Sequence, residues 1–99
     1  MAQVYGKRVT LNGSVQQLTA LVTNAPTNYV KSVQIQAGSA NAGVTYLGTA
    51  TMTATTDGYS FLGGSAAQQF SGGDSGVVDL SKIYLLGTNN DVVWVSYVL

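Results

Sequence analysis

One stretch of this sequence has the residue types of a catalytic site. Gly73-Asp74-Ser75-Gly76 matches the surroundings of the nucleophile in one class of serine hydrolases. A serine of that class needs a histidine to take its proton, and the chain contains none. A Ser–Lys arrangement with Lys82 is the remaining alternative. Because Gly and Asp are also the expected residues of a tight turn, we expect a loop here and no catalytic residue.

Charged side chains are scarce along the whole chain. They make up 8% of the 99 residues, four basic and four acidic, with no His and no Cys, whereas an ordinary soluble domain carries roughly a quarter. General acid–base catalysis needs a group that titrates near neutrality. Asp74, Asp79 and Asp91 lack the spacing of a cation-binding loop. We therefore expect no enzymatic activity, no cofactor and no metal site.

The overall charge and hydropathy argue against nucleic acid and membranes as partners. The net charge is zero, which gives no electrostatic basis for binding nucleic acid or an anionic membrane. No apolar run reaches the length of about 18 residues that spans a membrane, and no signal segment is recognisable at the start. We expect synthesis in the cytoplasm and a working state that is assembled, since a protein of zero net charge tends to associate.

Period-two alternation predicts the first strands. The first carries four residues on one face: Tyr5, Lys7, Val9 and Leu11. Asn12-Gly13 then predicts a hairpin turn, because both residues tolerate a positive φ; the turn also explains the glycosylation-like Asn12-Gly13-Ser14. A second strand is expected over residues 15–22, with an inner face made of Leu18, Ala20 and Val22.

Later strands follow the same logic. Strands are expected over residues 32–37, 44–47 and 49–55, and a final hairpin over residues 83–86 and 92–99 with a turn at 87–91. The Gly-rich residues 63–76 predict a long loop, or two short edge pieces around Phe70. The whole predicts one all-β domain over residues 1–99, an antiparallel β-sandwich or small jelly-roll-like barrel of about seven to eight short strands.

The final strand is apolar on both faces. Residues 92–99 read Val-Val-Trp-Val-Ser-Tyr-Val-Leu, a run typical of a strand that is covered on both sides. We therefore expect Trp94 and its whole strand to be buried, covered either by the opposite sheet and a loop or by another subunit. Core packing is expected for at least half of the larger aromatic side chains, and a sugar-stacking platform is the functional alternative; the set is Tyr5, Tyr29, Tyr46, Tyr59, Tyr84, Trp94 and Tyr97.

The order of these segments resembles a known group of proteins. Ser32–Ala37, Asn41–Gly48, Asp79–Gly87 and the closing apolar strand together resemble the small all-β structural proteins of tailed-bacteriophage virions, which include capsid decoration (cement) proteins and head or tail fibre domains. The resemblance covers about residues 30–99 and implies a virion protein, a decoration subunit on the major capsid protein, and a homotrimer. The alternatives are a tail, neck or fibre-base component, or a carbohydrate-binding module for host attachment.

Candidate partner contacts lie at both ends of the chain. Residues 1–8 are a candidate N-terminal arm, in which Val4 and Tyr5 supply an apolar anchor and Lys7 and Arg8 flank it. The alternative is an edge strand within the same subunit. At the other end, aromatic side chains favoured at interfaces are supplied by Trp94 and Tyr97.

Overall fold

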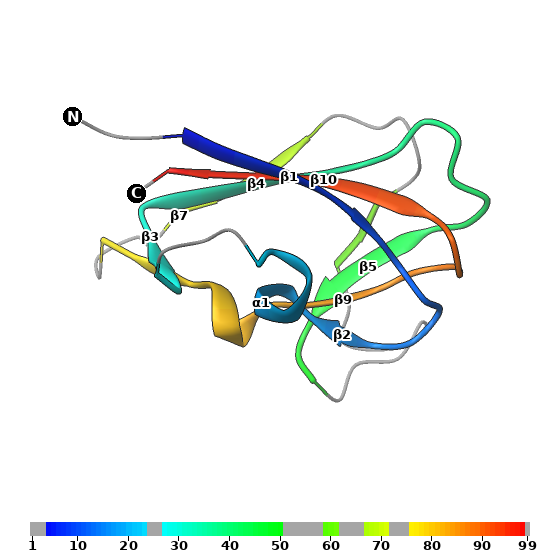
Figure 1. Ribbon diagram of the computed structural model, residues 1–99, viewed down its shortest axis with the longest axis horizontal. Coiled ribbons are helices and arrows are strands. Elements are labelled where there is room, and N and C mark those ends of the chain that lie inside the picture. Colours follow the sequence, from blue (N-terminus) through cyan, green and yellow to red (C-terminus); the bar gives the residue numbers. More distant parts are fainter. Residues whose placement is uncertain (1–3, 24–26, 51–58, 62–66, 72–75, 99) are drawn as a thin grey trace.

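The protein is an all-β sandwich of antiparallel sheets (Figure 1). A computed structural model describes residues 4–23, 27–50, 59–61, 67–71 and 76–98. The first sheet has the order β1-β10-β4-β7, with strands Val4–Thr10, Val92–Val98, Ser32–Ala37 and Gln68–Ser71. The second has the order β2-β9-β5-β6, with strands Gln16–Gln17, Tyr84–Leu86, Thr45–Gly48 and Tyr59–Phe61. A small third pair joins β3 and β8, over Tyr29–Val30 and Val78–Asp79.

Strand β10 is central in the first sheet. It pairs with β1 along its whole length and with β4 over six residues. Val93, Val95 and Tyr97 alternate into the core, as expected for the strand's inner side. Trp94 instead points outward and is 52% exposed. The prediction that Trp94 is buried is therefore wrong, because in the described residues no second layer covers this face of the antiparallel sheet.

The core lies between the two sheets and draws on nearly every element. The expected alternation in β4 is confirmed: Val33, Ile35 and Ala37 are buried and the residues between them are not. The second sheet contributes Leu85, and the helical segments contribute Leu18 and Leu80. The full set of buried apolar residues is Val9, Leu11, Leu18, Val22, Val30, Val33, Ile35, Ala37, Leu80, Leu85, Val93, Val95 and Tyr97.

A short helix replaces most of the predicted second strand. After the two residues of β2, the chain forms α1 over Leu18–Leu21. The Val22 amide donates to the Leu18 carbonyl at 2.8 Å, which closes one helical turn. Leu18 and Val22 are both buried, as four-residue spacing on a helix requires, whereas Ala20 is exposed. The expected inner face is thus correct at two positions and wrong at Ala20.

The two predicted hairpins are crossings between sheets. Strand β1 pairs with β10, and β2 pairs with β9, so the Asn12-Gly13 bend carries the chain from the first sheet to the second. The turn at 87–91 returns it from β9 to β10. At the first bend Gly13 has the expected positive φ, +85°, whereas Asn12 does not; at the second bend Asn90 has a φ of +74°. The two bends are also joined: the Leu11 amide donates to the Asp91 carbonyl at 2.8 Å.

The remaining strand predictions are met in part. The short strand expected at 44–47 is β5, shifted by one residue, and Phe70 lies in the edge strand β7, so the edge-piece alternative holds there. The strand expected over 49–55 lies outside the described residues beyond Ala50. Residues 72–75, which include the Asp74 and Ser75 of the serine motif, lie outside them as well.

A buried carboxylate fixes the corner between β4 and β10. Asp91 is 4% exposed and accepts two backbone hydrogen bonds, from the Ala42 amide at 2.8 Å and the Gly43 amide at 3.0 Å. Beside it, the Asn41 side chain accepts from the Val92 amide at 2.8 Å and donates to the Val92 carbonyl at 2.9 Å. Asp91 and Asn41 therefore hold the loop after β4 against the start of β10.

Replacing Asp91 should destabilise the fold strongly. In Asp91→Ala two backbone donors lose a charged acceptor in a buried corner, and we expect the free energy of unfolding to fall by about 3 kcal/mol. Urea unfolding at neutral pH measures it. Asp79→Asn, at a more accessible aspartate, is the control and should cost less than about 1 kcal/mol. An Asp91→Ala protein as stable as this control would contradict the role assigned to Asp91.

Adjacent residues of β10 should respond in opposite ways to a carboxylate. Val95→Asp buries an unpaired charge between the sheets, and we expect a loss above about 4 kcal/mol or failure to fold. Ser96→Asp puts the same group on the outer face and should leave a folded protein. Circular dichroism and urea unfolding of the two variants test this, and equal stability of the two would refute the register of β10.

Candidate interaction surfaces

The outer face of the first sheet gathers an aromatic, a basic and several neutral polar side chains. The strand register sets Arg8 beside Trp94, and Trp94 beside Gln36. The next row holds Gly6, Ser96 and Gln34. We call these two rows the Trp94 face; it consists of Gly6, Arg8, Gln34, Gln36, Trp94 and Ser96. Because all six belong to paired strands, their positions are fixed by the sheet and not by a loop.

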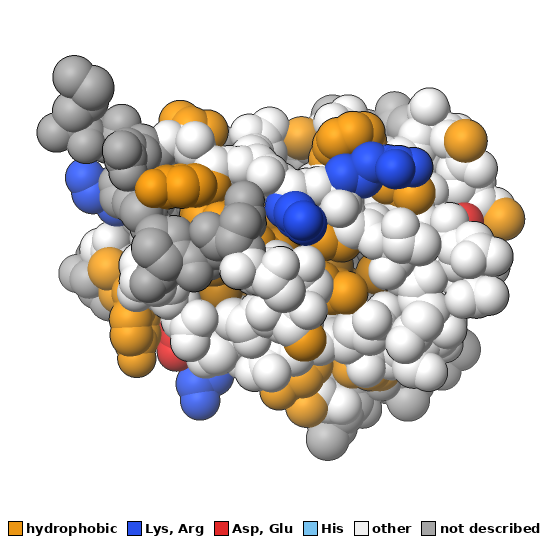
Figure 2. Space-filling view, viewed as in Figure 1, with side chains coloured by type: hydrophobic (Ala, Val, Ile, Leu, Met, Phe, Trp, Pro, Cys, Tyr) orange, Lys and Arg blue, Asp and Glu red, His pale blue; other side chains and the backbone are white. Residues whose placement is uncertain are grey.

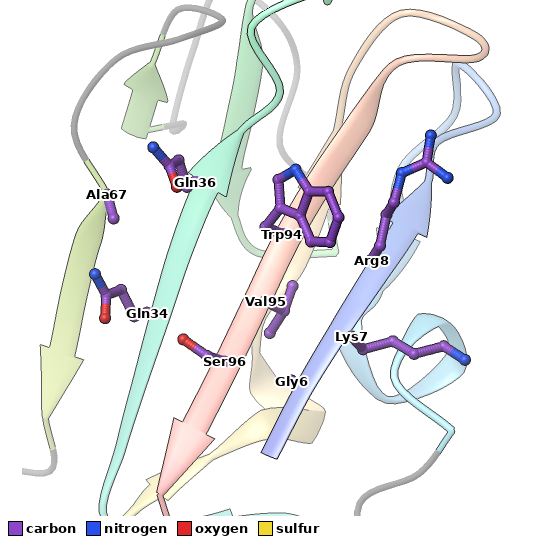
Figure 3. Close-up of a pocket in the computed structure, with 9 residues that line it drawn as sticks. All are labelled: Gly6, Lys7, Arg8, Gln34, Gln36, Ala67, Trp94, Val95 and Ser96. Carbon is purple, nitrogen blue, oxygen red and sulfur yellow. The ribbon is translucent and has the colours of Figure 1, made fainter. Parts of the chain in front are cut away.

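A groove of about 310 Å³ runs over the Trp94 face. Figure 3 shows the indole of Trp94 between Gln36 on β4 and Arg8 on β1. Ala67 closes the β7 side of the groove, whereas the Lys7 side chain points away from it past the edge of β1. A second groove of about 360 Å³ lies on the other side of the same Trp–Arg pair, along residues 38–41. Trp94 and Arg8 therefore separate two grooves and line both of them.

Arg8 and Trp94 form a cation–π pair. The guanidinium carbon is 5.8 Å from the centroid of the indole ring, within the range of this attraction. Arg8 is the one charged side chain among the described residues on the outer side of the first sheet, and no carboxylate is among the described residues that line either groove. The pair gives a locally positive, half-apolar surface on an outer face that is otherwise neutral among the described residues.

Tyr5 and Tyr97 lie on the opposite side of the first sheet. Their rings stack with centroids 5.4 Å apart and planes within 9°. Tyr97 is buried in the core and Tyr5 packs partly buried against it. Burial, followed by the neighbouring Tyr5, raises the pKa of the Tyr97 phenol. The structure therefore assigns these two tyrosines to core packing, and it corrects the prediction that Tyr97 is available as a partner contact.

A second surface lies where the described chain begins and ends. Three of the four large apolar side chains that are exposed among the described residues lie there: Val4 at 74%, Tyr29 at 59% and Val77 at 44%. Val4 pairs with Val98, whose carbonyl accepts from the Lys31 amide at 2.7 Å. Figure 1 shows β3 on the same side of the molecule as the start of β1 and the end of β10. We call this surface, defined by Val4, Tyr29 and Val77, the terminal end.

Charge is sparse on the side of the molecule seen in Figure 2. Its few basic and acidic side chains are scattered among neutral polar groups and apolar patches.

At the terminal end the carboxylate of Asp79, opposite Tyr29, accepts hydrogen bonds from the Ser81 hydroxyl at 2.6 Å and the Ser81 amide at 3.0 Å. These two hydrogen bonds, with a smaller effect of Lys82, hold the pKa of Asp79 below its ordinary value of 3.8. Asp79 is thus engaged in capping the 3-10 helix Leu80–Lys82.

The predicted contact residues are divided among these surfaces. Arg8 and Trp94 come together, Lys7 points away from them, and Val4 lies at the terminal end. Residues 4–8 belong to β1, so the edge-strand alternative describes them better than a free arm; residues 1–3 lie outside the described chain. Residues of the two surfaces that the predicted partner contacts did not include are Gly6, Tyr29, Gln34, Gln36, Val77 and Ser96.

The described residues contain no group of three or more His, Cys, Asp or Glu side chains placed to hold a metal ion. No helix in the described ranges is long and apolar enough to cross a membrane. Comparison with protein families, with curated proteins and with solved structures found no match. The candidate function therefore rests on the two surfaces.

Ser81 should control the acidity of Asp79. In Ser81→Ala the carboxylate loses its shortest hydrogen bond, so we expect its pKa to move upward, toward the ordinary value. A lowered pKa in the folded state stabilises the protein above the unfolded-state pKa, and that contribution is lost as the pH falls through the folded-state pKa. NMR titration of the Asp79 carboxyl carbon measures the shift. An unchanged pKa in Ser81→Ala would exclude the hydroxyl as its cause.

Proposed function

We propose that this protein is a non-enzymatic structural protein of a bacteriophage virion, a decoration subunit that binds the major capsid protein on the outside of the head. Three observations support the proposal. The order of strands and turns resembles that of such proteins, the fold is a small all-β sandwich, and the composition is poor in groups for catalysis.

The exposed apolar side chains of the terminal end are the observation that supports this surface as the site of attachment. Val4 and Tyr29 are more than half exposed, and Val77 lies close to that. Burying these exposed apolar side chains against a partner is favourable by about 25 cal/mol per Å² of apolar surface. The terminal end is therefore where this subunit contacts the capsid shell.

Because the chain has few charged side chains, attachment to the shell depends on apolar burial and neutral hydrogen bonds. With four basic and four acidic side chains, long-range steering by charge contributes little to attachment. Apolar burial and neutral hydrogen bonds remain, and each contact is weak. Assembly as a homotrimer at threefold positions of the shell multiplies them, because several linked contacts bind far more tightly than one.

Variants at the terminal end should weaken attachment without unfolding the subunit. We expect Val4→Ser combined with Tyr29→Ser to lower the affinity for particles that lack the subunit by at least about tenfold, which corresponds to 1.4 kcal/mol. Sedimentation of subunit with particles measures it. Raising the salt to about 1 M should weaken the unaltered protein only slightly, since screening acts on charges.

The control is Trp94→Ser, which removes the fourth exposed large apolar side chain, farther along the first sheet. It should bind particles as the unaltered protein does. Full occupancy by the Val4→Ser/Tyr29→Ser protein would refute attachment through the terminal end. Binding of the unaltered subunit at the tail, neck or fibre base, visible by cryo-electron microscopy, would favour the runner-up position in the virion over the head.

A further inference from the structure

We propose that the Trp94 face binds an acidic saccharide, that is, a pyranose chain that carries a carboxylate. This inference goes beyond the proposed function and does not depend on it, since it concerns the isolated subunit. It follows from the juxtaposition of one exposed indole, one guanidinium and three neutral polar side chains over a groove of about 310 Å³.

Trp94 supplies the surface on which a sugar ring stacks. Its indole is 52% exposed at the middle of the face, and Figure 3 shows the ring nearly face-on in a view onto the strands. A pyranose ring has an apolar face of C–H groups, and an aromatic ring that is apolar on its face and polar at its N–H suits it. A half-exposed indole on a rigid central strand pays little ordering cost when a ligand covers it.

Gln34, Gln36 and Ser96 supply groups that match hydroxyls. Each amide offers a donor and an acceptor, and the serine hydroxyl offers both, so all three can bond to sugar hydroxyls in either direction. Gln34 and Gln36 are exposed, and Ser96 is half-buried beside Gln34. Held on paired strands, these groups keep a fixed spacing, as a binding site requires.

Gly6 leaves the groove open. It lies opposite Ser96 on β1, and a Cβ added there would meet only the Val95 carbonyl oxygen, at 3.9 Å. Neither packing nor backbone conformation therefore demands glycine at this position. A larger side chain would instead fill the groove, which makes Gly6 a means of blocking the site without disturbing the core.

Arg8 determines the charge of the ligand. A guanidinium binds a carboxylate through two parallel hydrogen bonds, and no carboxylate is among the described residues that line the groove. The site is thus locally positive on a chain of zero net charge. Nucleic acid is a poorer match, because its phosphates call for a row of basic side chains, and Lys7 points away from the groove.

The matched pair of ligands that tests this is trigalacturonate and its methyl ester, which share the sugar rings and differ in charge. The chain has a single tryptophan, so its fluorescence reports directly on Trp94. We expect trigalacturonate to change the emission and to bind with an affinity of about 1 mM or better, and the ester to bind at least about tenfold more weakly. Sialyllactose and lactose provide a second acidic and neutral pair.

Variants separate the parts of the site, with calorimetry as the readout where tryptophan is removed. Trp94→Ala and Gly6→Leu should each weaken trigalacturonate binding at least about tenfold, and Arg8→Gln should abolish the preference for acid over ester. Tyr29→Ala and Lys82→Gln, which alter an aromatic and a basic residue outside the groove, should bind as the unaltered protein does. Circular dichroism confirms that every variant is folded.

Three results would overturn the inference. The first is no heat and no change in fluorescence with any of the four saccharides. The second is unchanged trigalacturonate binding by Trp94→Ala and Gly6→Leu. The third is equal binding of acid and ester, which would make the ligand a neutral saccharide. None of these results bears on attachment to particles, which is tested by variants of the terminal end.

Discussion

The rest of the structure depends on the position of β10 between two hydrogen-bonded neighbours. Because β1 and β4 both pair with it, its register decides which side chains of the first sheet face the core and which face outward. Every second residue of β10 enters the core, and the residues between them build the Trp94 face. A slip of one residue would exchange the two sets, placing Trp94 inside and Val95 on the surface. The register of β10 thus determines both the core and the candidate binding face.

Sequence patterns predicted the fold class well and the connections poorly. Alternation in residues 33–37 and the β-branched, turn-rich composition identify an all-β sandwich, because both reflect local geometry. The Asn12-Gly13 and 87–91 bends were correctly placed but wrongly read as hairpins, since a bend does not reveal which strand the chain pairs with next. The helix at Leu18–Leu21 was missed because Leu18, Ala20 and Val22 also fit a strand. The four-residue spacing of Leu18 and Val22 fits both periods.

For the candidate surfaces too, local sequence predicts which way a side chain faces, but not which side chains from other strands lie beside it. The outward side of Gln34 and Gln36 follows from their own strand, but their position beside Trp94 and Arg8 depends on the pairing of three strands distant in sequence. The error at Trp94 has a physical origin: an apolar run is typical of a strand covered on both sides, and a strand that exposes one large apolar side chain on its outer face gives the same pattern. Tyr97, two residues away, shows the other outcome, since it packs on Tyr5 in the core.

Accessibility of Trp94 in the native protein tests this account most directly, and the single tryptophan makes the signal unambiguous. The account predicts long-wavelength emission that acrylamide quenches readily in the folded protein, with only a modest change on unfolding in urea. Short-wavelength emission that acrylamide reaches only after unfolding would contradict it, because Trp94 would then lie in the core and the Trp94 face would not exist.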